Sequence, residues 1–287
     1  MFYPVGKAIN NENWRVPPAL NAKNYDVISA NPETVHFRTN LALVNYQNSH
    51  FSVQLDRTIT LLSPQQISRQ LSIELPTSVN QVAYRSHTSL TNLGEDWRPE
   101  KGLITLWSMA MLQGTDDSVS MFVIAPEQGP VQSYLYPLYA DRLISRNHLV
   151  FFKTDGKYRS KIGIPADISG DLILSYSPSL AKLTVLKITI DQDGRYPISL
   201  EKLYTKQAKG DVTNAYNHGN MDGSLLAKSA FYELESAAPM LALKTNQSVS
   251  HTQQVFHFVG NSKQLDAISQ QLVGINVSDT NTLFKSE

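Results

Sequence analysis

Short runs of β-branched and aromatic residues recur along the whole length of this chain, and turn-forming residues follow each of them. Clear examples are residues 37–44, 51–55, 103–107, 121–125 and 183–190. Gly, Asn and Asp separate these runs at intervals that are typical of an antiparallel meander. The pattern predicts an all-β fold in which antiparallel strands form two stacked layers.

Only two segments have the signals of helices. Residues 63–67 begin with Ser and Pro and predict a single capped turn, and residues 262–272 place Leu265, Ile268 and Leu272 at helical spacing behind Ser262. The chain contains no internal repeat and no linker, which predicts one domain over residues 1–287. Residues 103–112 are apolar on both alternating faces, which predicts a central strand covered on both sides.

The composition narrows the classes of partner. Lys and Arg together number 25, as do Asp and Glu, so the chain lacks the basic surplus that nucleic acid binding requires. No apolar run approaches the ~18–20 residues of a membrane span, so we expect no membrane partner. The 287 residues include no cysteine, which excludes disulfides and thiolate ligands. This composition is compatible with either the periplasm or the cytoplasm.

Residues 231–236 form the most informative local pattern. Glu233 and Glu235 alternate with Tyr232 and Leu234, so both carboxylates lie on one face of the predicted strand, with Cα atoms roughly 6.5–7 Å apart. On a covered face, desolvation and mutual repulsion raise the pKa of one carboxyl, which suits a general base near neutral pH. The alternative interpretation is a solvated edge strand, in which glutamates are ordinary.

A polar loop and a basic segment are further candidates for binding. The loop contains Asn214, Asn217 and His218, whose side chains can hydrogen-bond sugar hydroxyls or can simply stabilise a turn. The basic segment, residues 153–163, predicts a hairpin around its Asp-Gly turn that places Arg159 and Lys161 on one face. Such cations could hold a carboxylate, a phosphate or sugar hydroxyls, or could form salt bridges on a surface hairpin.

Cofactor and metal signatures are absent from the sequence. His251 and His257 share one face of a predicted strand, but no dense histidine spacing accompanies them. There is no nucleophile elbow, phosphate loop or dinucleotide fingerprint. We therefore expect neither a metal nor a cofactor.

Six segments together resemble an uncharacterised bacterial family of the galactose mutarotase-like superfamily. They are residues 14–20, 91–94, 102–107, 155–163, 210–217 and 231–236. The resemblance extends over nearly the whole chain. It implies a β-supersandwich with a concave sheet that binds carbohydrate.

The same resemblance implies roles for individual residues. Aldose epimerases of this superfamily use a glutamate as general base on the anomeric hydroxyl and a histidine as general acid on the ring oxygen. Glu235, which Pro239 follows, resembles the base, and Glu233 is the substitute. Trp107 occupies the place of the histidine, so His218 or His87 would have to replace it. The predicted groove is lined by Trp107, Arg159, Lys161, Asn214, Asn217, His218, Glu233 and Glu235.

Three functions are compatible with this pattern. The first is an aldose 1-epimerase-like isomerase with Glu235 as its base. The second is a non-catalytic carbohydrate-binding module, which the missing histidine favours. The third is structural, with Glu233 and Glu235 pairing with Arg159 and Lys161 as an ion network. Family members have a longer N-terminal portion, so we expect a shortened start and an exposed sheet edge that favours pairing with another copy.

Overall fold

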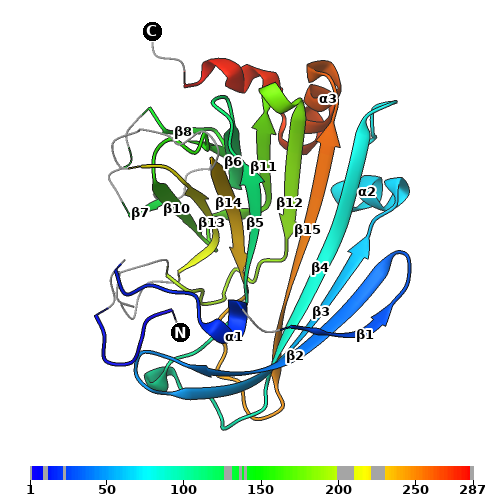
Figure 1. Cartoon of the computed structure of the whole chain (residues 1–287). Coiled ribbons are helices and arrows are strands. Elements are labelled where there is room, and N and C mark those ends of the chain that lie inside the picture. Colours follow the sequence, from blue (N-terminus) through cyan, green and yellow to red (C-terminus); the bar gives the residue numbers. More distant parts are fainter. Residues whose placement is uncertain are drawn as a thin grey trace.

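A computed structural model describes residues 2–8, 12–21, 24–125, 131–135, 138, 141–198, 210–220 and 230–284. Within these residues the strands form two antiparallel sheets (Figure 1). In spatial order, the ten-stranded sheet contains β1 (Asp26–Ala30), β2 (Thr34–Val44), β3 (His50–Leu61), β4 (Asn80–Asn92), β15 (Ser248–Val259), β12 (Lys182–Ile188), β11 (Ser169–Ser177), β6 (Val119–Ile124), β9 (Leu149–Lys153) and β8 (Leu143–Arg146). The five-stranded sheet contains β5 (Trp107–Gln113), β14 (Phe231–Ala237), β13 (Asp211–Asn217), β10 (Ser160–Pro165) and β7 (Gln132–Tyr134).

A shared hydrophobic core holds the two sheets together. Phe122 and Phe152 from the larger sheet belong to the same buried cluster as Ile162, Tyr232 and Leu234 from the smaller one. Burial of apolar side chains at this interface, at about 25 cal/mol per Å² removed from water, is the main force that keeps the layers stacked. The prediction of an all-β, two-layer supersandwich is confirmed.

Two helices cover the other face of the larger sheet (Figure 1). They are α2 (Pro64–Leu71) and α3 (Ser262–Val273), whose buried residues Ile67, Leu265 and Ile268 pack in one cluster with strand residues such as Phe256. The remaining helical segments are short: α1 (Pro18–Asn21) and the 3₁₀ turns Pro99–Lys101, Pro178–Leu180 and Val277–Thr282. Among the described residues, no helix has the length and apolar character needed to cross a bilayer.

The helix starts were only partly predicted. Ser63 caps α2 as expected, but the helix continues to Leu71 instead of ending after one turn. Ser262 does not cap α3. Asn261 does so, because its side-chain oxygen accepts a hydrogen bond from Gln264 N at 3.0 Å while the Gln264 side chain accepts one from Asn261 N.

The stretch 103–112 is not the central strand that its composition predicted. The strand β5 begins only at Trp107, and it lies at the edge of the five-stranded sheet. Ile104 and Leu106 are buried before the strand starts, whereas Met109 and Met111 on its outer face are 49% and 63% exposed. Because methionine is apolar even where it is exposed, the composition of this stretch resembled that of a strand covered on both faces.

The predicted hairpin at residues 153–163 is also wrong. The strand β9 before the Asp-Gly turn belongs to the larger sheet, and β10 after it belongs to the smaller one. Asp155 is buried and accepts hydrogen bonds from Arg142 Nη2 at 2.5 Å and from Lys157 N at 2.9 Å. The turn is therefore a crossover between the sheets, and the buried Arg142–Asp155 ion pair fixes its position.

The strand β1 forms one edge of the larger sheet, and all five of its residues are exposed. Val27 and Ile28 are among the exposed apolar side chains of the chain. An uncovered edge of this kind is a template for pairing. Pairing with another copy of the chain stays a prediction.

A buried histidine between the sheets makes the stability of the fold depend on pH. His251 Nε2 and Ser236 Oγ are 2.7 Å apart, and Gln253 donates to the same hydroxyl at 3.0 Å. Burial, reinforced by the charge of His87, lowers the pKa of His251 from 6.5 to about 4. The folded protein thus holds a neutral imidazole over a pH range in which the unfolded chain takes up a proton.

We therefore expect the free energy of unfolding to fall as the pH drops from about 6.5 to about 4, by about 3 kcal/mol from this group. Urea unfolding of the wild type and of His251→Gln at several pH values measures the difference in slope. The exposed His50→Gln variant is the matched control and should follow the wild type. Parallel curves for the wild type and His251→Gln would contradict the assignment.

Candidate functional site

The outer face of the five-stranded sheet, which is the face directed away from the larger sheet, carries the candidate site. Strand register arranges its side chains in rows. Glu233 lies across from Tyr216 on one side and Met111 on the other. In the next row Glu235 lies across from Asn214 and Met109. Both glutamates therefore share one face, as the sequence predicted, and Tyr232 and Leu234 are buried on the other.

Glu235 is fully buried, and Lys161 and Trp107 contact its carboxylate. Lys161 Nζ lies 2.9 Å from its Oε1 and 2.7 Å from its Oε2, and Trp107 Nε1 donates to Oε2 at 2.9 Å. The same ammonium lies 5.0 Å from the centre of the Trp107 ring. These contacts stabilise the ionised form of Glu235, because desolvated charges persist only when they are paired and hydrogen-bonded.

Glu233 is the proton-exchanging group of this face. It is half-buried, and burial together with the negative charge of Glu235 raises its pKa to about 7, against the opposing effect of Lys161. A hydrogen bond to Glu235 adds to the same shift. Near neutral pH, Glu233 is therefore divided between its acid and its base form.

His218 lies one row away from Glu233, just past the end of β13. Its ring stacks on Phe231 with centroids 4.4 Å apart, and its Nδ1 lies 3.1 Å from the Tyr216 hydroxyl. Burial and the nearby charge of Arg159 lower the pKa of His218. The imidazole is therefore neutral at pH 7, next to the tyrosine that lies across from Glu233.

The other predicted residues divide between the two faces. Asn214 lies on the outer face beside Glu235. Asn217 does not, because strand alternation turns it inward, where its amide donates to Tyr158 O at 2.9 Å and its oxygen accepts from Gly156 N at 2.8 Å. Asn217 therefore supports the crossover, and its predicted place in the groove is wrong. His87 belongs to β4 of the larger sheet and bonds Thr252.

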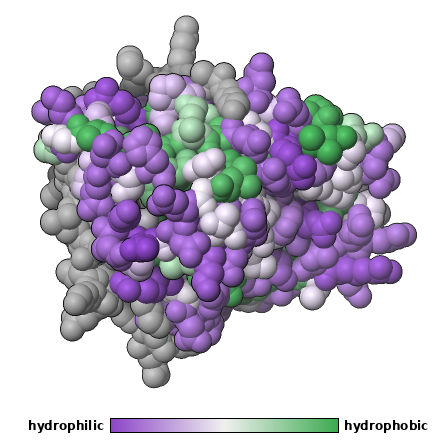
Figure 2. Space-filling model, turned by 90° about the horizontal axis from the view of Figure 1, so that it is seen from below, coloured by the Kyte–Doolittle hydropathy of each residue, from purple (hydrophilic) through white to green (hydrophobic). Residues whose placement is uncertain are grey.

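Two aromatic residues near the start of the chain, Phe2 and Trp14, stack beside Trp107, and we did not predict this contact from the sequence. Phe2 packs edge-on against Trp107 with centroids 5.7 Å apart and stacks on Trp14 at 5.6 Å. Figure 1 places this segment, in dark blue, beside one end of the smaller sheet. On the face of the molecule that Figure 2 shows, hydrophobic residues form separate green patches on a largely hydrophilic surface.

Tyr216 was also missed, although a signal for it existed. It lies two residues from both Asn214 and His218, so strand alternation alone places all three side chains on one face. The contact with Phe2 had no such signal, because it joins segments that are far apart in the sequence.

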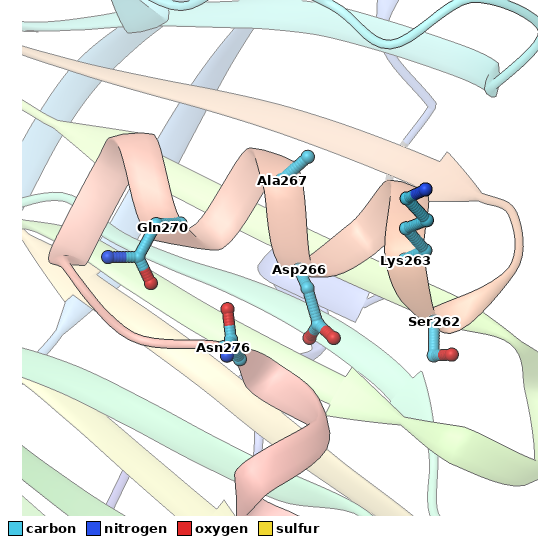
Figure 3. Close-up of a pocket in the computed structure, with 6 residues that line it drawn as sticks. All are labelled: Ser262, Lys263, Asp266, Ala267, Gln270 and Asn276. Atoms are coloured by element: carbon cyan, nitrogen blue, oxygen red, sulfur yellow. The ribbon is translucent and has the colours of Figure 1, made fainter.

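A surface pocket outside the five-stranded sheet is a weaker candidate for a functional site. This pocket, of about 400 Å³, lies along α3 and is lined by Ser262, Lys263, Asp266, Ala267, Gln270 and Asn276 (Figure 3). Its acidic residue is already engaged, since Asp266 accepts hydrogen bonds from the Ser278 backbone N at 2.9 Å and hydroxyl at 2.7 Å. Within the described residues, no three His, Asp or Glu side chains are grouped to hold a metal ion.

Solved structures of two other proteins share this fold. One is a candidate aldose 1-epimerase from Escherichia coli K12, with a TM-score of 0.50 and 8% identity over 82% of this chain and 68% of that one. The other is a galactose mutarotase-like protein from Lactobacillus casei, with a TM-score of 0.50 and 13% identity over 88% of this chain and 82% of that one. At these identities the likeness establishes the fold, which is galactose mutarotase-like.

Sequence comparison gives the family. No curated protein matches the chain. One family model, described as a family of unknown function, matches residues 1–284. Since the match spans almost the entire sequence, the chain belongs to this family, DUF6786.

Proposed function

We propose that this protein binds a carbohydrate on the outer face of the five-stranded sheet and interconverts its anomers, as an aldose 1-epimerase-like isomerase. The observation that carries the proposal is the pair of carboxyls on β14, of which Glu235 is a paired anion and Glu233 has a pKa of about 7. A carboxyl whose pKa is raised to near neutrality beside a second, ion-paired carboxylate is typical of acid–base sites. The fold shared with a candidate aldose 1-epimerase supports the choice of substrate class.

In this proposal Glu233, and not Glu235, is the base. Lys161 and Trp107 already bind the oxygens of Glu235, whereas Glu233 is only half-buried and can contact a sugar hydroxyl. Glu233 in its carboxylate form removes the proton from the anomeric hydroxyl, the C1–O5 bond breaks, and a C1=O bond forms. The ring oxygen takes a proton, and ring closure on the other face of the carbonyl returns both protons.

Tyr216 supplies the proton to the ring oxygen. It lies directly across from Glu233, where paired Cβ atoms are about 4.5–5.5 Å apart, so the two groups can contact neighbouring oxygens of one sugar. The Tyr216 hydroxyl lies 3.1 Å from His218 Nδ1, so an imidazole that carries its hydrogen on Nδ1 can return the proton that the hydroxyl gives to the sugar. His218 therefore acts through Tyr216 and is a positioning residue.

The test is proton NMR of freshly dissolved α-anomers of several aldoses, with and without the protein. Faster approach to anomeric equilibrium supports the isomerase. Sugar resonances that broaden without any acceleration would instead support a non-catalytic binding module. That second function is favoured by one observation: Trp107, which stands where the resemblance implies a catalytic histidine, is bound to Glu235.

The pH dependence of the reaction should report Glu233. Because the base form is active, we expect kcat/KM to rise with pH through about 7 and to level off above it. The measurement is the rate of anomer interconversion across the neutral range, corrected for the buffer-catalysed reaction. A rate that falls as the pH rises through 7 would exclude Glu233 as the base.

A further inference from the structure

Arg159 is a cation of the outer face, and no carboxylate of the described residues pairs with it. It immediately precedes β10, two residues before Lys161, and so belongs to the same face by strand alternation. Extension of the β10–β13 register places it across from His218. Its Nε is buried and has no hydrogen-bond partner, and the guanidinium is in no ion pair within the part of the chain that the structure describes.

The neighbouring charges are already engaged. Lys161 neutralises Glu235, Lys157 pairs with Asp116 at 2.8 Å, and Arg142 pairs with Asp155. The carboxylate of Asp211, at the far end of β13, accepts a hydrogen bond from Tyr134. His218, which faces Arg159, is neutral at pH 7. Among these groups Arg159 is the uncompensated positive charge.

An unpaired guanidinium with a buried donor is costly unless something binds it, since an unsatisfied buried donor costs about 1–3 kcal/mol. The planar fork of arginine matches carboxylate and phosphate groups, to which it donates two parallel hydrogen bonds. A neutral hydroxyl can accept a hydrogen bond from the guanidinium but does not compensate its charge. The free guanidinium therefore favours an anion.

We propose that Arg159 binds an anionic substituent of the sugar, so that the ligand is an acidic sugar bearing a carboxylate or a phosphate. This inference rests on the proposed carbohydrate site and specifies its substrate class. Arg159 and Glu233 are two strands and one row apart, which corresponds to roughly 12 Å between Cα atoms. Both side chains belong to the same face of the sheet, so one sugar can present its anomeric hydroxyl to Glu233 and its anionic group to Arg159.

The test compares acidic sugars with their neutral parents by titration calorimetry on the intact protein at pH 7. The probes are galacturonate, glucuronate and glucose 6-phosphate against galactose and glucose. We expect at least one acidic sugar to bind roughly 10- to 100-fold more tightly than its parent, from the strength of charge-assisted hydrogen bonds. Whether uronates or the phosphate gain most identifies the anion. Added salt should weaken only the acidic ligands.

Arg159→Gln should abolish the preference, so that acidic and neutral sugars bind about equally, and Arg159→Lys should keep part of it. Lys157→Gln, which removes a neighbouring surface cation, is the matched control and should bind like the wild type. Thermal melts confirm that each variant is folded. Equal binding of acidic and neutral sugars, or a preference that survives Arg159→Gln, overturns the inference and leaves the carbohydrate site standing. Binding of no sugar of either class overturns both.

Discussion

Replacing Glu233 by Gln is expected to reduce the rate of anomer interconversion by about 10²- to 10⁴-fold, the usual contribution of a positioned general base. The amide has the shape of the protonated carboxyl but cannot accept the proton. It also removes the repulsion between Glu233 and Glu235, so the free energy of unfolding should stay equal or rise slightly. The rate is measured by NMR with saturating sugar, and stability by urea unfolding.

The matched control for this variant is Glu74→Gln, which makes the same chemical change at an exposed glutamate outside the five-stranded sheet. It should have wild-type activity. Wild-type activity in Glu233→Gln itself would show that another group is the base. A Glu233→Gln variant that binds sugar with unchanged affinity and loses turnover would separate catalysis from binding.

Replacing Lys161 by Met is expected to lower the free energy of unfolding by about 3–5 kcal/mol, because it leaves a carboxylate buried without its counter-charge. Glu235 is 0% exposed and Lys161 only 6%, so water cannot take the place of the ammonium. The hydrogen bond from Trp107 remains, but a single neutral donor does not offset the desolvation of the charge. Urea unfolding measures the loss.

Two further variants test this explanation. The double variant Lys161→Met with Glu235→Leu removes both charges and should recover most of the loss, since apolar replacement of a buried pair is often neutral or stabilising. Lys157→Met breaks a pair with the exposed Asp116 and should cost no more than about 1 kcal/mol. A loss of less than 1 kcal/mol in Lys161→Met would mean that the carboxylate is solvated.

Local patterns predicted what depends on neighbours along the chain. The alternation of β14 placed Glu233 and Glu235 on one face and Tyr232 and Leu234 on the other, and the register confirms it. The prediction for Asn217 was wrong because the expected loop is the end of a strand, and alternation along that strand turns its amide inward. The hairpin at Asp155 failed for a different reason: a turn signal does not say whether the two strands it joins pair with each other.

The sequence by itself determined the all-β class, the shared face of the two glutamates and the absence of thiol chemistry, because each follows from residue type and from a period of two. Only the tertiary structure decided which glutamate is ion-paired and which has the raised pKa. The pairing of Lys161 with Glu235 and the approach of Trp107 bring together three strands of one sheet. They leave Glu233 with the raised pKa, and they leave Arg159 without an ion pair among the residues that the structure describes. The pKa of a buried group depends on its distance from charges that lie far away in the sequence, and only folding sets those distances.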